Sequence, residues 1–239
     1  MGYTDIHTHI LPGVDDGSIS LEQSMLMLHK AFDEDVRRIY LTPHYIPGRR
    51  NASKEHRLTA FEELRAQALK ELPDLELYLG NEIYYRENAL SDLKAGEAFT
   101  MADTDYVLLE FDIHSDYKIL QKAVKQFTEA GYKPILAHIE RYDALFKQAE
   151  RVEELIDAGA AIQVNADSLR GGLLHPVAKF CKYLLKNDLI HFLGSDCHNL
   201  NHRPPLMETA LKGLYKNYGQ NLDRIMNRNV QKLVKNKWM

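Results

Sequence analysis

The chain has 239 residues, of which 45% are hydrophobic and 27% charged, a composition typical of a folded globular protein without low-complexity segments. Its formal net charge of -4 argues against a nucleic-acid-binding or membrane-surface protein, since both need a concentrated basic surface. The sequence shows neither an apolar signal segment at its start nor a run of about 18 apolar residues. We therefore expect a cytoplasmic protein that does not insert into membranes.

Short apolar runs alternate with longer stretches of helical periodicity along the whole chain. The predicted strands are residues 3–7, 36–41, 75–80, 106–110, 134–137, 161–164 and 190–193. Predicted helices include residues 20–32, opened by the capping box Ser20-x-x-Gln23, residues 53–72, and a last amphipathic helix over 220–235. Alternating strands and helices predict a parallel sheet. We expect one α/β domain over residues 1–239, folded as a closed or nearly closed (β/α)7 barrel.

Potential metal ligands follow almost every predicted strand. Six of the seven strands lead into such residues, and the exception leads into Asn165. The candidates are His7, His9, Asp16, His44, Glu82, Glu110, His138, Asp196 and His198. Because the carboxyl ends of parallel strands meet at one mouth, these side chains should lie together there. Imidazole and carboxylate ligands without thiolates suit manganese, iron or zinc.

Each part of this pattern is weak when taken alone. The spacing His7-x-His9 places both rings on one face of a strand, yet such pairs also arise by chance. The same holds for Asp196-x-His198, which is also compatible with a hydrogen-bonded loop, and a glutamate at a strand end is often a solvated or capping residue. Chance does not place such groups after nearly every strand. The combination therefore predicts a metal site.

Several segments resemble the polymerase and histidinol phosphatase (PHP) superfamily. They are Asp5-Ile-His7-Thr-His9, Thr42-Pro-His44, Gly80-Asn-Glu82, Leu136-Ala-His138 and Gly194-Ser-Asp196-Cys-His198. Within this superfamily the chain looks most like the bacterial protein-tyrosine phosphatases encoded with capsule and exopolysaccharide genes. Four segments carry that likeness: residues 9–17, 80–84, 108–111 and 137–142.

The resemblance implies a distorted (β/α)7 barrel whose metal site lies at the C-terminal ends of the strands. It also implies three divalent metal ions, with manganese the first choice and iron or zinc as alternatives. In this pattern His7, His9, Glu82 and Asp196 hold one ion, Glu82, Glu110 and His138 a second, and Asp16, His44 and His198 the third. Asp15 is the rival to Asp16, and only the resemblance separates the two.

The implied activity is that of a metal-dependent phosphotyrosine-protein phosphatase. A hydroxide bridging two metal ions would attack phosphorus, and Arg141 and Arg203 would contact the phosphoryl oxygens. The expected partner is a phosphorylated bacterial tyrosine kinase that regulates capsular or exopolysaccharide synthesis. Candidate substrate contacts are Tyr45, Arg49, Phe111 and Tyr142, with Tyr84 as a further aromatic side chain beside the site.

Two other interpretations remain open at this point. A small-molecule phosphatase of the histidinol-phosphate type would share the metals and differ in the pocket, and a non-catalytic phosphotyrosine-binding domain would recognise the same ligand without cleaving it. Cys197 and Arg203 also match the C-x5-R spacing of cysteine-based tyrosine phosphatases. The intervening residues contain no glycine to cradle a phosphate, so we interpret this spacing as a coincidence.

Overall fold

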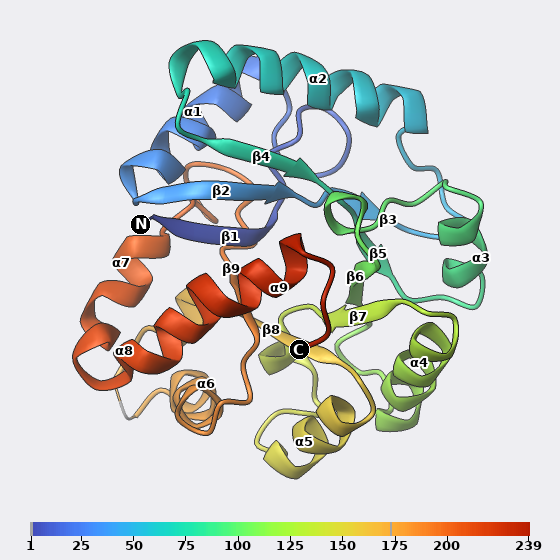
Figure 1. The fold of residues 1–239 in the computed structure, drawn as a ribbon, viewed down its shortest axis with the longest axis vertical. Helices are drawn as coiled ribbons and strands as arrows, with labels where there is room; N and C mark the ends of the chain where they lie inside the picture. The colour runs from blue at the N-terminus through green and yellow to red at the C-terminus, as the bar shows by residue number, and fades with distance from the viewer. Residues whose placement is uncertain (1, 173) are drawn as a thin grey trace.

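The computed structural model describes residues 2–172 and 174–239, and its strands form a parallel sheet surrounded by helices (Figure 1). The strands in these residues are β1 (Tyr3–Thr8), β2 (Val36–Leu41), β3 (His44–Tyr45), β4 (Glu76–Leu79), β5 (Glu82–Tyr84), β6 (Tyr106–Glu110), β7 (Lys133–Leu136), β8 (Ala161–Asn165) and β9 (Phe192–Gly194). Every paired strand runs parallel to its neighbour. The predicted α/β class is confirmed.

The helices lie on the outside of this sheet (Figure 1). They are α1 (Leu21–Asp33), α2 (Lys54–Glu71), α3 (Ala89–Lys94), α4 (Tyr117–Glu129), α5 (Ala149–Asp157), α6 (Pro176–Lys186), α7 (Met207–Leu211), α8 (Tyr215–Asp223) and α9 (Val230–Val234). Short 3-10 segments are η1 (Met101–Asp103), η2 (Ile139–Arg141), η3 (Ala166–Leu169) and η4 (Lys212–Leu214), and η5 (Arg224–Asn229) is a π-helix. Ser20 and Ser53 cap α1 and α2 at their predicted starts.

Two of the predicted strands, residues 36–41 and 75–80, are each followed by a second short strand that the sequence did not predict. β2 pairs with β4 and β3 pairs with β5, so β3 continues β2 and β5 continues β4. The break between β2 and β3 contains Pro43, which has no N–H to donate to the backbone hydrogen bonds between strands. At the break between β4 and β5, the Asn81 side chain donates a hydrogen bond to the carbonyl of Pro43 (2.8 Å). The nine strands therefore occupy seven positions, as a (β/α)7 arrangement requires.

The first and last strands also meet. A parallel bridge joins Thr8 to Cys197, just beyond β9. The amide of His9 donates to the carbonyl of Cys197 (2.9 Å), and the amide of Asp196 donates to the carbonyl of His7 (2.8 Å). These bonds hold the segment after β9 beside β1. The first and last strands of the sheet are therefore joined.

Apolar side chains form one layer inside the curved sheet and another between the sheet and the helices. The inner layer includes Ile6, Tyr40, Leu108, Ile135 and Phe192. The C-terminal segment covers the ends where β6 and β7 begin: Lys133 Nζ donates to the carbonyl of Asn236 (2.5 Å). The opposite, carboxyl ends of the strands remain available for the polar side chains. Among the described residues, no helix is both long and apolar enough to cross a membrane.

The predicted C-terminal helix over residues 220–235 is confirmed as continuous helical backbone up to Val234, but its pitch changes within the segment. The structure divides it into the end of α8, the π-helix η5 and α9. Within η5 the buried side chain of Asn229 donates to the carbonyl of His191 (2.8 Å). This long-range bond next to β9 favours a local change of helical pitch, which periodicity within the segment does not indicate.

Candidate metal centre

β1 presents His7 and His9 to the mouth of the sheet. The pairing of β1 with β2 shifts register between Asp5 and Thr8, an irregularity of the kind that redirects side chains next to active sites. Two glycines allow neighbouring backbone to approach these histidines. A Cβ on Gly194 would lie 2.5 Å from the Cβ of His7, and one on Gly17 would lie 2.1 Å from the carbonyl oxygen of His9. Larger residues at either position would displace the histidines.

Two further candidates sit at strained backbone positions. His138 follows β7 with φ of 31°, and Asp196 follows β9 with φ of 55°, both in the left-handed region that non-glycine residues rarely adopt. Backbone of this kind costs free energy and is concentrated at functional sites. At both positions the turn directs a ligand-type side chain into the same site.

The innermost group consists of His7, His9, Glu82 and Asp196, all buried. Glu82 Oε1 lies 3.2 Å from His7 Nε2, and Glu82 Oε2 lies 3.2 Å from His9 Nε2. Asp196 Oδ1 lies 3.7 Å from His7 Nε2 and 3.4 Å from His9 Nε2. The structure thus brings together the four side chains expected to share one ion.

Glu82 also connects this group to residues from β3, β6 and the turn after β7. His138 Nε2 lies 2.8 Å from Glu82 Oε1 and 3.6 Å from Glu110 Oε1. His44 Nδ1 lies 3.0 Å from Glu82 Oε2 and 3.6 Å from Glu110 Oε2. Glu82 therefore lies between the two groups of donor atoms, while His44 approaches the second group more closely than the resemblance implied.

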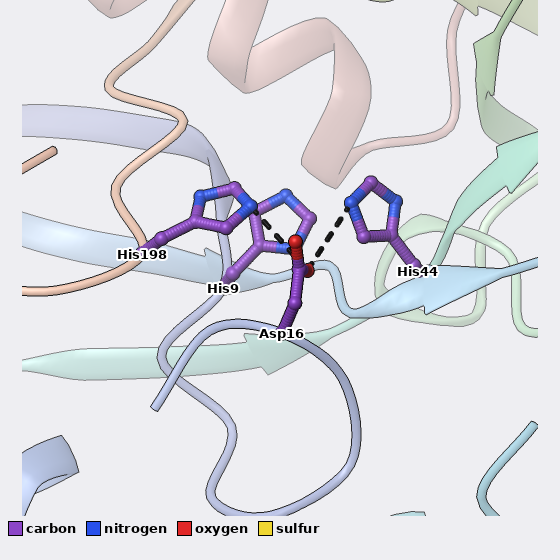
Figure 2. Close-up of side chains that lie close together, drawn as sticks. All are labelled: His9, Asp16, His44 and His198. Carbon is purple, nitrogen blue, oxygen red and sulfur yellow. Dashed lines mark ion pairs between the residues drawn. The ribbon is translucent and has the colours of Figure 1, made fainter. Parts of the chain in front are cut away.

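An outer group lies toward solvent and contains His9, Asp16, His44 and His198 (Figure 2). The carboxylate oxygen Asp16 Oδ1 lies 3.5 Å from His44 Nε2 and 3.6 Å from His198 Nε2, as the dashed lines in Figure 2 mark. The Asp16 side chain is 72% exposed. An ion held here would be the one most accessible to substrate.

The neighbouring Asp15 has a different position. Its buried carboxylate accepts a hydrogen bond from His9 Nδ1 (2.8 Å) and another from the backbone amide of His44 (3.0 Å). Asp15 therefore orients His9 from behind and leaves Nε2 of that ring facing the site. This arrangement favours Asp16 over Asp15 as the ligand.

The nitrogen and oxygen atoms of this cluster are arranged to bind cations rather than to form hydrogen bonds with one another. His7 Nε2 and His9 Nε2 lie 3.2 Å apart although both face carboxylates. Glu82 Oε2 and His44 Nδ1 are buried 3.0 Å apart, yet neither makes a hydrogen bond of good geometry among the described residues. Buried polar atoms without partners are costly, and divalent ions would satisfy them. Three groups of donor atoms within the described residues have the spacing of a metal site.

The pKa shifts in the cluster also indicate that it favours bound cations. Burial lowers the pKa of His9, but hydrogen bonds to Asp15, Asp196 and Glu82 outweigh it and raise the pKa well above its usual value. Burial raises the pKa of Glu82, but the charge of His7 and hydrogen bonds from other histidines hold it well below its usual value. The carboxylates thus favour positive charge on these rings. Divalent ions would take the place of those protons.

Two functional side chains on β8 were missed by the sequence analysis. Gln163 Oε1 accepts a hydrogen bond from His7 Nδ1 (3.2 Å) and one from the amide of His138 (2.7 Å). Asn165 Nδ2 donates to Asp196 Oδ2 (2.9 Å). Both residues orient ligands rather than serve as ligands. The alternation Gln163-x-Asn165, which places both side chains on one face as in His7-x-His9, was the available signal.

Arg57 supports the site from α2, and it was also missed. Its guanidinium is buried and donates to Asn81 Oδ1 (2.7 Å) and to the carbonyl of Glu97 (2.5 Å). Asn81 precedes Glu82 at the break between β4 and β5. The arginine therefore fixes the backbone that presents Glu82.

Arg141 and Arg203 approach the site at Asp196, and Arg203 Nη1 also lies 3.2 Å from Nε2 of His198. Arg141 Nη1 lies 3.2 Å from Asp196 Oδ2, and Arg203 Nη2 contacts the same oxygen. Asp196 Oδ1 faces His7 and His9, whereas Oδ2 of the same carboxylate faces the two arginines. Both guanidinium groups are partly exposed and lie within reach of an anion bound at the mouth.

The predicted substrate contacts divide into buried and exposed residues. Tyr142 is fully buried, Phe111 is 2% exposed and Tyr45 is 7% exposed, so this structure leaves none of these rings a free face for stacking. Tyr142 instead accepts a hydrogen bond from the amide of Phe111 (3.2 Å). Among the aromatic and basic candidates, Arg49 is exposed and Tyr84 partly so.

Cys197 has the environment of a structural thiol. Its side chain is fully buried, and burial raises the pKa of the thiol to about 12. A nucleophilic cysteine needs a lowered pKa and an exposed sulfur. The structure therefore agrees with the interpretation of the C-x5-R spacing as a coincidence.

Comparison with known proteins identifies the family of this site. Residues 3–235 match the family model described as "Capsular polysaccharide synthesis, CpsB/CapC". The chain belongs to this family. It is 37% identical over 220 residues to the tyrosine-protein phosphatase CpsB of Streptococcus pneumoniae, covering 90% of each chain. It is also 30% identical over 232 residues to the tyrosine-protein phosphatase YwqE of Bacillus subtilis, covering 97% of this chain and 91% of YwqE.

The fold of this CpsB/CapC family member also matches a solved relative. The chain superposes on this structure with a TM-score of 0.89 and 30% sequence identity, over 99% of its own length and 96% of the other chain. The solved structure belongs to a pair described as YwqE from Bacillus subtilis and CpsB from Streptococcus pneumoniae, "unique metal-dependent tyrosine phosphatases". The expected resemblance to capsule-associated protein-tyrosine phosphatases is thereby confirmed, and the strand order agrees with the expected (β/α)7 barrel.

Proposed function

We propose that this chain is a metal-dependent protein-tyrosine phosphatase whose ions are held by the nine predicted ligands. One observation carries the proposal: nine imidazole and carboxylate side chains from separate segments converge at the mouth of the sheet, with two arginines beside them. The relatives in the CpsB/CapC family carry the name tyrosine-protein phosphatase. The intact ligand set favours a catalyst over a domain that only binds phosphotyrosine.

Three divalent ions, one for each group of donor atoms, agree best with this arrangement. The ligands are His7, His9, Asp16, His44, Glu82, Glu110, His138, Asp196 and His198. We infer manganese as the first choice, because the ligands are oxygen and imidazole nitrogen without thiolate; iron and zinc accept the same ligands. When bound, such ions supply Lewis-acid charge stabilisation and activation of a water molecule.

The residues of the chain supply orientation and charge. Arg141 and Arg203 would bind the phosphoryl oxygens and stabilise the negative charge that develops on them during transfer. Asp15 and Gln163 hold His9 and His7 in their orientations through their Nδ1 atoms. The orientations of His9 and His7 are therefore fixed before substrate binds, so these side chains need little reorganisation during the reaction.

Phosphotyrosine fits this site because of its leaving group. A phenol has a pKa of about 10, lower than that of an alkyl alcohol, so its departure depends less on a general acid. We assign no general acid in this site. We propose a phosphotyrosine protein as the substrate, in particular a bacterial tyrosine kinase of capsular or exopolysaccharide synthesis, met in the cytoplasm. The family description and the names of the relatives support this choice.

Turnover of paired substrates tests the proposal. We expect the manganese-loaded protein to release phosphate from a phosphotyrosine peptide much faster than from histidinol phosphate or from the same peptide carrying phosphoserine. His138→Ala, which removes a ligand without entering the helical layers, should abolish turnover and preserve the circular dichroism spectrum. Faster turnover of histidinol phosphate would instead assign the chain to small-molecule phosphatases.

A further inference from the structure

A polar cavity of about 500 Å³ adjoins the metal centre on the side of Arg141 and Arg203. Its lining comes from η3, the turns after β7 and β8 and the loop after β9. It includes Arg141, Asn165, Ser168, Arg170 and Arg203. Ligand pockets have volumes of roughly 300 to 1,000 Å³, so this space can hold more than a phosphoryl group.

The charges lining this cavity are mainly positive. Three arginines face it, while the only carboxylate of a described lining residue is that of Asp167. Arg141 and Arg203 already contact Asp196 and have a role at the phosphoryl group. Among the described residues, Arg170 makes no hydrogen bond or ion pair with any of the nine proposed ligands, so the proposed chemistry leaves it without a function.

Arg170 is available for a ligand. Its Nη1 donates to Asp167 Oδ1 (2.8 Å), an i,i+3 ion pair in which the side chains are 46% and 68% exposed. Exposed ion pairs of this kind contribute little to stability. A guanidinium has five N–H donors, and the pair with Asp167 uses one of them, so most remain free for a second carboxylate.

We infer that this cavity binds a second anionic group of the substrate peptide, next to the phosphotyrosine, with Arg170 as the specificity-determining residue. This inference rests on the proposed phosphatase function. With the phosphoryl group held between the metal ligands and Arg141 and Arg203, a peptide that continues past Arg203 enters the cavity and meets Arg170. The ligand chemistry is that of an acidic side chain or of a second phosphorylated residue.

Selectivity between matched peptides tests the inference. The manganese-loaded protein is assayed on phosphotyrosine peptides flanked by glutamate, by glutamine or by phosphoserine, placed in turn on the amino and carboxyl sides. We expect kcat/KM to be roughly twofold to fivefold higher with an anionic flank on one side, which is within the range for one partly exposed ion pair. The glutamate and phosphoserine arms show which anion the cavity prefers.

The ratio to compare is kcat/KM for the anionic peptide divided by kcat/KM for the neutral peptide. The variant Arg170→Gln should reduce this ratio to about 1. Arg65→Gln is the matched control, because Arg65 is also an exposed arginine paired at i,i+3, with Glu62 at 3.7 Å on α2. It should keep the full ratio. Equal ratios in wild type and Arg170→Gln would overturn the inference while leaving the phosphatase function intact. Absence of turnover on every phosphotyrosine peptide would instead overturn the function and the inference together.

Discussion

Asp15 and His9 form a carboxylate–imidazole pair in which Asp15 Oδ2 lies 2.8 Å from His9 Nδ1. The same oxygen accepts the backbone amide of His44 (3.0 Å), and Asp15 Oδ1 accepts that of Gly17 (3.0 Å). Asp15 thus joins two histidines and the loop that carries Asp16. The two neighbouring aspartates have different surroundings: Asp15 orients His9 and His44, whereas Asp16 faces the proposed metal site.

Substitution of each aspartate by alanine should separate their roles. Asp15→Ala leaves buried donors without an acceptor, so we expect the free energy of unfolding of the metal-free protein to fall by about 1–3 kcal/mol. Asp16→Ala removes an exposed carboxylate and should change it by no more than about 0.5 kcal/mol. Urea unfolding in the presence of a chelator measures both. Equal losses would refute the division of roles.

Replacement of Arg141 or Arg203 by alanine should impair catalysis without releasing metal. Both arginines contact the oxygen of Asp196 that faces away from His7 and His9. We expect kcat to fall by about 10²- to 10³-fold, the usual cost of removing one donor to a transition-state anion. Steady-state kinetics and metal analysis of the same samples provide the measurement. Unchanged kcat, or loss of the ions in parallel with activity, would contradict the assigned role.

Cys197 should be dispensable for the chemistry. Because its thiol is fully buried and burial raises its pKa to about 12, we expect Cys197→Ala to keep kcat within about threefold of wild type. Treatment of the native protein with iodoacetamide should leave turnover intact, whereas a chelator should stop it. Inactivation by alkylation that Cys197→Ala prevents would restore the cysteine mechanism.

His191 should make the protein less stable in mild acid. The ring is 8% exposed, accepts a hydrogen bond from the amide of Ile162 (3.1 Å), and has its pKa lowered to about 4 by burial and by the charges of Arg224 and Lys232. The unfolded chain binds a proton at about pH 6.5, so the folded state takes up fewer protons between pH 6.5 and 4. Stability should therefore decrease as the pH falls through this window, by up to about 3 kcal/mol.

The variant His191→Asn isolates this contribution. Its amide oxygen can accept the same bond from Ile162 but does not titrate, while the other groups that respond to pH stay the same. The stability advantage of wild type over this variant should therefore shrink between pH 7 and 4, as measured by urea unfolding. Parallel pH profiles for the two proteins would show that His191 is not protonated on unfolding.

The sequence predicted the site better than it predicted the details of the fold around it. Ligands such as His44, Glu82 and His138 could be recognised because parallel strands deliver their carboxyl ends to one place, whatever the exact strand bounds. The break between β4 and β5 depends on Asn81 reaching Pro43 and on Arg57 reaching Asn81, contacts between residues distant in sequence. Periodicity within one segment carries no information about such contacts.

The same limit explains why the sequence analysis missed the side chains that orient the proposed ligands. Gln163 and Asn165 have neither the charge nor the ring of a typical ligand, so their function appears only when β8 lies beside β9. Burial of Tyr45, Phe111 and Tyr142 likewise depends on packing from several elements. Position after a strand indicates closeness to the mouth, but it does not distinguish a ring that faces substrate from one that packs beneath the ligands.

Manganese titration of metal-depleted protein, with metal content and phosphotyrosine-peptide turnover measured in the same samples, tests the central claim most directly. We predict that the depleted protein is folded but inactive, and that turnover returns as the groups around His9, Glu82 and Glu110 fill, up to about three ions for the three groups of donor atoms. Full turnover by protein that contains no metal would contradict the account.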